Sequence, residues 1–381
     1  NEWKRHRKII GSTFNQKILN SLVDIFGDYS NILVERLKGT VGKGCVDMFP
    51  NLTLCTLDIV CDTTMGTKVK AMKEGSQYIL WTSRASELGI MRLFNIFLHP
   101  NFIWKMSSNY KETQLISQKV QDYVRQIIER KKCERGQRAG FDEAPKKKIF
   151  LDYLLNLTGQ DDRWRDEESV EEARTIVVAG SDATALSVCY VLMMLAMHQE
   201  IQNKVYEEIV SIFEDDRSST PEDLQKMCYL ERVIKETLRL FPARGLIARR
   251  LTKDIVLGSY VLPKDTCVCV PILCLHRDFH LWSDPLTFDP DRFLPEEVSK
   301  RHPYAYLPFS GGPRNCIEFQ IRQFFIGFRY AMLAMKTILL TLLRHYRVVA
   351  TTYTSISDIK LKFDVATKCV GGQNIQLEVR S

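Results

Sequence analysis

The feature that most constrains the fold of this 381-residue chain is an almost wholly apolar run of 22 residues, Ile176 to Met197. A helix of that length extends about 33 Å, which is enough to cross a bilayer. Polar side chains interrupt its first half at Ser181, Asp182, Thr184 and Ser187, and a carboxylate at mid-span costs about 2.5–3.5 kcal/mol on insertion scales. The flanks also lack the basic asymmetry of membrane proteins. We therefore predict a long central helix of a folded core, with a membrane span as the alternative.

Composition places the chain among folded proteins. Apolar residues make up 45% and charged residues 26%, a balance that excludes a disordered chain or a collagen-like repeat. The net charge of +7 is mild and dispersed, so it does not indicate nucleic acid as a partner. The 11 cysteines include no Cys-x-x-Cys pair. Because disulfide frameworks belong to short secreted chains, we expect reduced and mostly buried cysteines.

Hydrophobic periodicity predicts a mainly α fold with small β-sheets, and the length allows one large core or two to three domains. Apolar spacings of three and four indicate helices up to about residue 130, then from about Leu224 to Leu240 and from Tyr330 to Leu343. The basic stretch Lys131 to Lys148 is expected to be an exposed loop. The Ser-x-x-Glu sequence at Ser169–Glu172 is expected to open the central helix as a capping box. Short β-rich pieces lie in the last third, at Ile255–Leu257 and Cys267–Val270.

The sharpest chemical signal is the run Pro308-Phe309-Ser310-Gly311-Gly312-Pro313-Arg314-Asn315-Cys316. Its glycines and prolines force a tight loop. A cysteine presented where backbone N–H groups and an arginine converge is favoured as the thiolate, and a thiolate is a ligand that donates electron density to haem iron. A buried structural cysteine beside a turn is the simpler alternative for Cys316 taken alone.

Five motifs in order make the chain resemble the cytochrome P450 superfamily. They are Trp3 with Arg7, Ala179-Gly180-Ser181-Asp182-Ala183-Thr184, Glu236-Thr237-Leu238-Arg239, Phe288–Phe293, and the loop with Phe309, Gly312, Arg314 and Cys316. Phe288 to Pro295 and Ala331 to Lys336 are most similar to family 4, the fatty-acid ω-hydroxylases and their insect relatives. The resemblance implies a single haem domain over residues 1–381. By it the chain begins inside the third main helix, so that a membrane anchor and the first helices are missing from it.

The resemblance implies one haem b, with the thiolate of Cys316 as the axial iron ligand. The implied cofactor-binding residues around it are Trp3, Arg7, Arg249, Phe309, Gly312 and Arg314. Several of these would pair the haem propionates, because an unpaired buried carboxylate is costly. Glu236, Arg239 and Arg292 are implied to form a buried structural triad, and removal of one partner would cost about 3–5 kcal/mol.

The central helix departs from the family's pattern at two positions. The resemblance implies that Asp182 and a following threonine relay protons during oxygen activation, but residue 183 is alanine and the threonine comes at Thr184. One residue turns a side chain by about 100° around a helix, so Thr184 cannot simply replace the missing hydroxyl. Asp182 and Thr184 remain the candidate catalytic residues, with Ser181, water or substrate as other proton sources. Ala179 stands where several family-4 members carry a glutamate esterified to haem, so that link is not possible here.

A nine-residue segment after Cys316 is the other departure. The family has a glycine two residues after the cysteine, where this chain has Glu318, and the matching continuation begins at Gly327. Excising Glu318–Ile326 restores the pattern. Nine helical residues leave half a turn, which would expose the apolar face of the next helix. We therefore interpret 318–326 as an insertion or splicing artefact; if it is real, it must loop out.

The implied activity is that of a haem-thiolate monooxygenase acting on a lipophilic substrate, such as a fatty acid, a hormone-like lipid or a xenobiotic. The implied electron donor is NADPH through a cytochrome reductase, with cytochrome b5 as a second candidate, on the cytoplasmic face of the endoplasmic reticulum membrane. Lys4, Arg5 and Lys8 are candidates for a reductase-binding patch, with a solvated helix face as the alternative.

Three other functions remain open from the sequence. A haem-thiolate isomerase or dehydratase would not need the missing threonine. A non-catalytic haem-binding pseudoenzyme is suggested by Ala183 together with Glu318. A zinc site at Cys274, His276 and His280 is disfavoured because no fourth ligand is apparent.

The insertion hypothesis predicts which peptides active protein contains. Mass spectrometry of a digest should find a peptide that joins Ile317 directly to Gly327. A peptide containing Phe319-Gln320-Ile321 from active protein would show instead that the segment is real.

Overall fold

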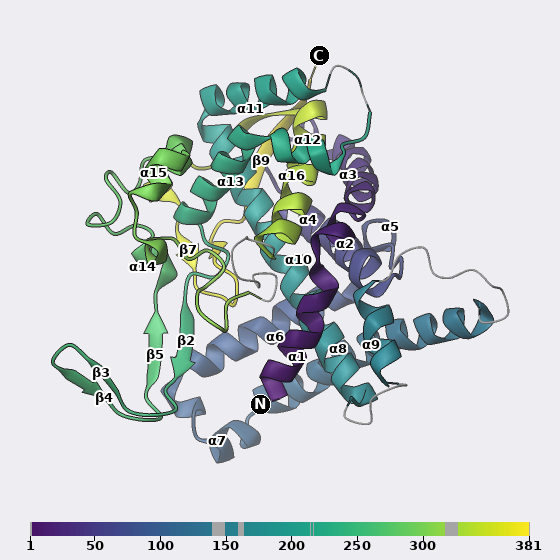
Figure 1. The fold of residues 1–381 in the computed structure, drawn as a ribbon, viewed down its shortest axis with the longest axis vertical. Coiled ribbons are helices and arrows are strands. Elements are labelled where there is room, and N and C mark those ends of the chain that lie inside the picture. Colours follow the sequence, from purple (N-terminus) through teal and green to yellow (C-terminus); the bar gives the residue numbers. More distant parts are fainter. Residues whose placement is uncertain are drawn as a thin grey trace.

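The structure is a computed structural model that describes residues 2–138, 149–158, 164–213, 215, 217–316 and 327–380. Helices surround one long central helix, and small sheets lie beside it (Figure 1). The helices are α1 (Glu2–Gly11), α2 (Gln16–Asn20), α3 (Val23–Leu37), α4 (Phe49–Val60), α5 (Ala71–Glu74), α6 (Gln77–Phe94), α7 (Asn101–Met106), α8 (Ser108–Arg138), α9 (Phe150–Thr158), α10 (Asp166–Met197), α11 (Gln199–Ile212), α12 (Pro221–Lys226), α13 (Cys228–Leu240), α14 (Ile272–Leu275), α15 (Pro295–Ser299) and α16 (Gly327–His345).

The described strands form four small antiparallel sheets, which confirms the predicted mainly α class with small β-sheets. One has the order β1-β9-β6, and the others are the pairs β2-β5, β3-β4 and β7-β8. The strands are β1 (Val46–Asp47), β2 (Ile247–Arg250), β3 (Ile255–Leu257), β4 (Tyr260–Leu262), β5 (Cys267–Val270), β6 (Tyr346–Thr351), β7 (Leu361–Lys362), β8 (Lys368–Cys369) and β9 (Asn374–Val379).

Helix α10 is the core helix that its apolar run predicts. Its apolar side chains from Ala185 to Leu195 are fully buried. The helix is long and apolar enough to cross a membrane, but most of that run lies inside the fold. Its first half packs closely on α4: the Thr56 hydroxyl donates to the Ser181 carbonyl at 2.9 Å, and a Cβ on Gly180 would lie 3.0 Å from Val60 Cγ2. A core helix, and not a membrane span, accounts for this burial.

The exposed loop predicted from Lys131 is wrong for residues 131–138, which continue α8. Their charged side chains pair with residues of α10 and α9: Lys132 Nζ lies 3.1 Å from an Asp166 carboxylate oxygen, and Arg135 donates to the Asn156 amide oxygen at 2.5 Å. A basic run without apolar period therefore indicates an exposed surface and does not by itself end a helix. Residues 139–148 lie outside the described part of the chain.

Two predicted helix boundaries also need correction. Helix α10 begins at Asp166, where the Glu168 carboxylate accepts from the Arg165 amide at 2.8 Å, so the capping box lies four residues before the predicted one. Ser169 instead accepts a bond from the Trp164 indole at 2.8 Å. The helix predicted from Leu224 to Leu240 is two helices, because Glu208 accepts from two N–H groups in the first turn of α13 and so caps a new helix there.

Helix α16 buries its apolar face as the sequence pattern after Gly327 requires. Ile338 and Leu339 are fully buried, and the Tyr330 hydroxyl lies 2.8 Å from that of Thr63. Segment Glu318–Ile326 lies outside the described residues, so the insertion hypothesis stays a prediction.

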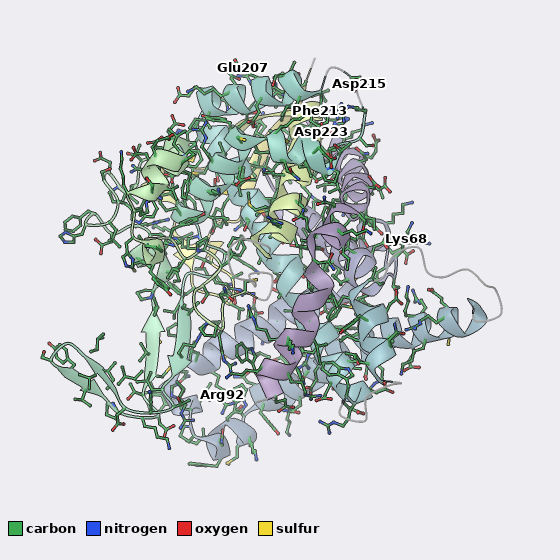
Figure 2. The ribbon with its side chains drawn as sticks, viewed as in Figure 1. Lys68, Arg92, Glu207, Phe213, Asp215 and Asp223 are labelled. Carbon is green, nitrogen blue, oxygen red and sulfur yellow. The ribbon has the colours of Figure 1, made fainter. Side chains whose placement is uncertain are left out.

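An exposed apolar patch occupies the turn between α6 and α8. Arg92, labelled in Figure 2, lies at its edge with its guanidinium 4.9 Å from the Trp104 ring centroid. The large side chains of the patch that are more than half exposed are Leu93, Phe94, Ile96, Phe97, Phe102 and Met106. So many exposed apolar side chains on one turn mark an interaction surface.

Candidate functional site

The loop that ends at Cys316 folds back on itself. The Cys316 amide donates to the Phe309 carbonyl at 3.0 Å, and the Asn315 amide donates to the Gly312 carbonyl at 3.1 Å. Ser310 and Gly312 have φ of +65° and +75°, the left-handed region that glycine adopts at low cost. These bonds hold Cys316, which is partly exposed, at a defined position.

Arg7 of α1 clamps this loop from across the sequence. One terminal nitrogen donates to the Asn315 carbonyl at 2.6 Å, and the other donates to the Asn315 side-chain oxygen at 2.6 Å and to the Cys316 carbonyl at 3.0 Å. Burial lowers the pKa of Arg7, and the charge of Cys316 opposes that shift. A guanidinium cation beside a cysteine favours its thiolate.

The contacts of Arg7 differ from the sequence-based expectation, which assigned it to a haem propionate. Its terminal nitrogens bind the cysteine loop instead. Its Nε is buried and has no hydrogen-bond partner among the described residues. The Nε–H of Arg7 is therefore available to a propionate.

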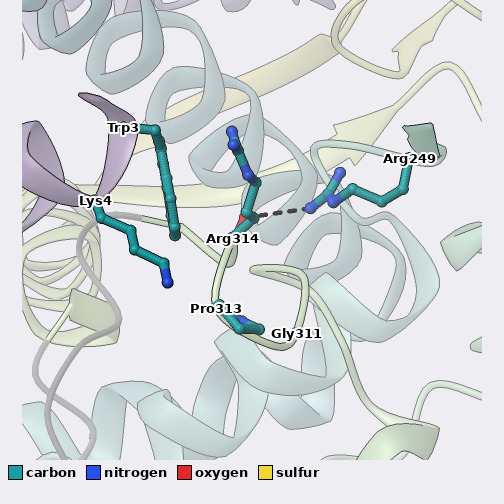
Figure 3. Close-up of a pocket in the computed structure, with 6 residues that line it drawn as sticks. All are labelled: Trp3, Lys4, Arg249, Gly311, Pro313 and Arg314. Atoms are coloured by element: carbon teal, nitrogen blue, oxygen red, sulfur yellow. Dashed lines mark hydrogen bonds between the residues drawn. The ribbon is translucent and has the colours of Figure 1, made fainter. Parts of the chain in front are cut away.

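A basic cavity of about 440 Å³ lies beside the loop (Figure 3). Arg249 of β2 reaches across to donate to the Arg314 carbonyl at 3.2 Å, and the Arg314 guanidinium lies 4.2 Å from the centroid of the Trp3 ring. The residues that line the cavity are Trp3, Lys4, Arg249, Gly311, Pro313 and Arg314. Its cations suit carboxylate groups, and the structure gathers here three of the residues assigned to propionates.

The predicted catalytic residues lie on different faces of α10. Ala179 is exposed, Asp182 and Ala183 are partly exposed, and Thr184 is buried against the core. Ser181 is also buried, with its hydroxyl donating to the Val177 carbonyl at 2.9 Å within the helix. Neither hydroxyl therefore shares the exposed face with Asp182. Burial raises the pKa of Asp182, against the opposing charges of Lys368 and Arg244. The catalytic roles of Asp182 and Thr184 stay predictions.

Glu236 and Arg239 form a fully buried bidentate pair. The Arg239 nitrogens Nε and Nη2 donate to the two carboxylate oxygens at 2.8 and 2.7 Å. Arg292 brings its Nε to 3.5 Å from the same carboxylate. Burial raises the pKa of Glu236, and Arg239 and the Asp289 amide oppose that rise. The structure thus assembles the triad that the sequence resemblance implies.

His276 connects this pair to the cysteine loop. Arg239 donates to the His276 carbonyl at 2.9 Å, and the Leu307 amide, just before the loop, donates to His276 Nε2 at 2.8 Å. Because Nε2 accepts, Nδ1 carries the proton and donates to the Arg239 carbonyl at 3.2 Å. Both ring nitrogens are engaged with backbone, so His276 is not placed to bind zinc.

The comparisons with known proteins agree with this geometry. The family model for cytochrome P450 matches residues 1–373. The chain belongs to this family. Its relatives include cytochrome P450 4c21 of Blattella germanica, 37% identical over all of this chain and 75% of the relative, and cytochrome P450 4V2 of Homo sapiens, 35% identical over 91% of this chain and 66% of the relative.

A solved structure shows the same fold. The crystal structure of a cytochrome P450DA heme domain matches 98% of this chain and 77% of its own, with a TM-score of 0.81 at 21% identity. The resemblance expected from the five motifs is therefore confirmed at the level of family and fold.

The cytochrome P450 family binds haem through a cysteine thiolate, and the residues present here fit that group. Cys316 is partly exposed beside a cation, the unpartnered Nε of Arg7 is a free donor, and the cavity lined by Trp3, Arg249 and Arg314 suits propionates. When bound, haem supplies the activation of dioxygen that makes these enzymes monooxygenases. Phe309 packs against the core, and Gly312 provides the left-handed turn.

The buried pair predicts that replacing Glu236 lowers the free energy of unfolding much more than replacing an exposed glutamate does. Glu236→Gln leaves the Arg239 cation buried without its counter-ion, so the free energy of unfolding should fall by about 3–5 kcal/mol. Glu297→Gln, which removes an exposed pair with Lys300, should change it little. Urea unfolding of the haem-loaded protein measures both, and equal losses would contradict the assignment.

His276 predicts an acid-dependent loss of stability. Burial lowers its pKa to about 4, below the unfolded value of 6.5, so the unfolded state binds the proton first as pH falls. The contribution of neutral His276 is complete above pH 6.5 and is lost progressively between pH 6.5 and about pH 4. The unfolding free energy of His276→Gln should therefore decline less over that interval than that of the native protein. An exposed control, His302→Gln, should follow the native curve; parallel curves for His276→Gln would contradict the prediction.

Proposed function

We propose that this cytochrome P450 inserts one oxygen atom of dioxygen into a C–H bond of a lipophilic substrate, with electrons from NADPH delivered by a cytochrome reductase. The observation that carries the proposal is the Arg7 clamp, which holds the cysteine loop and places a cation beside Cys316. A thiolate held in this way is the ligand this chemistry requires. Fatty acids, hormone-like lipids and xenobiotics are the substrate classes that the similarity to family 4 supports.

The residues of the chain have separate tasks in this proposal. The Arg7 clamp and the bonds within the loop keep Cys316 in position. Asp182 holds a proton on the exposed face of α10, where a raised pKa assists proton uptake. Because Ala183 offers no hydroxyl on that face, water or a group of the substrate must complete the proton path.

The reductase would dock on the α1 side of the molecule. Lys4 and Lys8 are exposed there and suit an acidic partner. Arg5 contributes less than the sequence suggests, because it is paired with the buried Glu168. Cytochrome b5 would use the same basic side.

We also propose that the protein works at the endoplasmic reticulum membrane. The exposed apolar patch between α6 and α8 supports contact with a lipid surface, since Arg92 lies at its edge and Lys105 directly precedes its exposed Met106 in the sequence. Basic residues beside apolar ones are typical of interfacial membrane contacts.

A haem-thiolate isomerase or dehydratase is the second candidate. The buried position of Thr184, together with Ala183 on the exposed face, favours it, because such a reaction needs no proton relay to dioxygen. It would also need neither NADPH nor dioxygen.

Isotope labelling distinguishes the two candidates. The full-length protein with reductase, NADPH and labelled dioxygen should give a product that carries one labelled oxygen atom, measured by mass spectrometry. Cys316→Ser should abolish that product, and Cys228→Ser, which changes an exposed cysteine, should not. An unlabelled product formed without NADPH would contradict the monooxygenase proposal and support the isomerase or dehydratase.

A further inference from the structure

Helix α1 meets the start of α10 through two pairs of residues, each four apart in the sequence. Glu2 and His6 share one face of α1, and Glu168 and Glu172 share one face of α10, because residues four apart are neighbours on a helix surface. His6 and Glu168 are buried, Glu172 is partly buried and Glu2 is exposed. The contact between the two helices therefore brings together one imidazole and three carboxylates.

The hydrogen bonds of His6 show which ring nitrogen is an acceptor. Nδ1 lies 2.7 Å from a Glu172 carboxylate oxygen, and an ionised carboxylate only accepts, so Nδ1 carries a proton and donates it. Nε2 lies 3.0 Å from Arg5 Nη2, and a guanidinium only donates, so Nε2 presents a lone pair. A histidine with its Nδ1–H held by a carboxylate and its Nε2 free to coordinate is the usual arrangement of a metal ligand.

A cationic group already lies between two acceptors at this position. Arg5 Nη2 contacts both His6 Nε2 and Glu168 Oε1. The Arg5 side chain is 33% exposed, and its guanidinium lies 5.3 Å from the centroid of the Trp164 ring. Because this side chain is long and reaches solvent beside an aromatic ring, it can give way to another cation.

The spacing of the acceptors suits a small divalent metal ion. Bonds of about 2.0–2.1 Å at tetrahedral angles place two ligand atoms about 3.3 Å apart, and His6 Nε2 lies 3.1 Å from Glu168 Oε1. Glu2 offers a carboxylate oxygen within 4.8 Å of ligand atoms of both residues, and its exposed side chain can close the remaining distance. Burial acts to raise the pKa of Glu168, but the hydrogen bonds that it accepts lower this pKa overall. Glu168 is therefore ionised, as a ligand must be.

We propose that Glu2, His6 and Glu168 bind a zinc ion at the contact between α1 and α10. Glu172 orients the His6 ring for this role. Imidazole and carboxylate groups are zinc ligands, and three protein ligands leave the fourth position of the ion to water. The ion takes the place of the Arg5 guanidinium. This inference does not depend on the proposed function.

The ion affects the cysteine loop through α1. Arg7 follows His6 directly in the sequence and clamps the loop that carries Cys316. An ion that links His6 to α10 therefore restrains the helix that carries this clamp. Because it binds the folded state, zinc should also raise the temperature at which the haem-loaded protein unfolds.

The test is the binding of zinc to the full-length haem protein, measured by calorimetry and by metal analysis after dialysis. The native protein should bind one zinc ion at this site. His6→Gln and Glu2→Gln should each weaken its binding at least tenfold, and Glu172→Gln about ten- to a hundredfold. Arg5→Gln should tighten it, because the competing cation is removed. Glu2→Gln changes an exposed side chain, so its result does not depend on whether His6→Gln folds.

Matched controls separate this site from other groups that bind zinc. His302→Gln removes an exposed histidine, and Cys267→Ser with Cys269→Ser removes two exposed thiols of β5. Both controls should keep the ion, with native affinity and with the same rise in unfolding temperature.

Two sets of results would overturn the inference. The first is a native protein that takes up no zinc, or takes up only zinc that the cysteine control loses, which would show that Arg5, His6 and Glu168 form an ion-pair network alone. The second is native affinity in both His6→Gln and Glu2→Gln, or weaker binding in Arg5→Gln, which would place the ion elsewhere. None of these measurements requires turnover, so they are independent of the labelling experiment.

Discussion

The buried guanidinium of Arg7 against the Cys316 loop is the interaction on which the site depends. It joins the first helix to a loop more than 300 residues later. A buried cation must have acceptors, and here the backbone and the amide of that loop supply them. The burial of Arg7 and the position of Cys316 therefore depend on each other, because a displacement of the loop would leave the buried guanidinium without its acceptors. The same cation stabilises the negative charge that the cysteine needs as a ligand.

A second set of buried bonds fixes the loop from its other end. The Glu236–Arg239 pair sits in α13, Arg239 holds the His276 carbonyl, and His276 accepts the Leu307 amide immediately before the loop begins. The neutral state of His276 belongs to this connection, because a protonated Nε2 could not accept that bond. The triad thus affects the site indirectly, because it fixes the position at which the cysteine loop begins. In helix α10 the second half is buried in the core, and the more exposed first half carries Asp182.

The family, the fold class and the central helix could be predicted because each rests on short continuous stretches of sequence or on the order of such stretches along the chain. The 22-residue apolar run and the loop ending in Cys316 are continuous stretches that can be recognised without any knowledge of packing. The helix end predicted at Lys131 was wrong because its charges are paired with residues of other elements. The partners of Arg7 were missed for a related reason: helical spacing gives the face on which Arg7 lies but not the loop it meets.

The central claim is that Cys316 is held as a thiolate ligand of haem iron. The most direct measurement is the carbon monoxide difference spectrum of the reduced full-length protein, recorded for the native chain and for Cys316→His. The account predicts the long-wavelength Soret band of thiolate ligation in the native protein and its replacement by an imidazole-type band in the variant. A native protein that takes up haem but gives the imidazole-type band, or a variant that keeps the thiolate band, would contradict it.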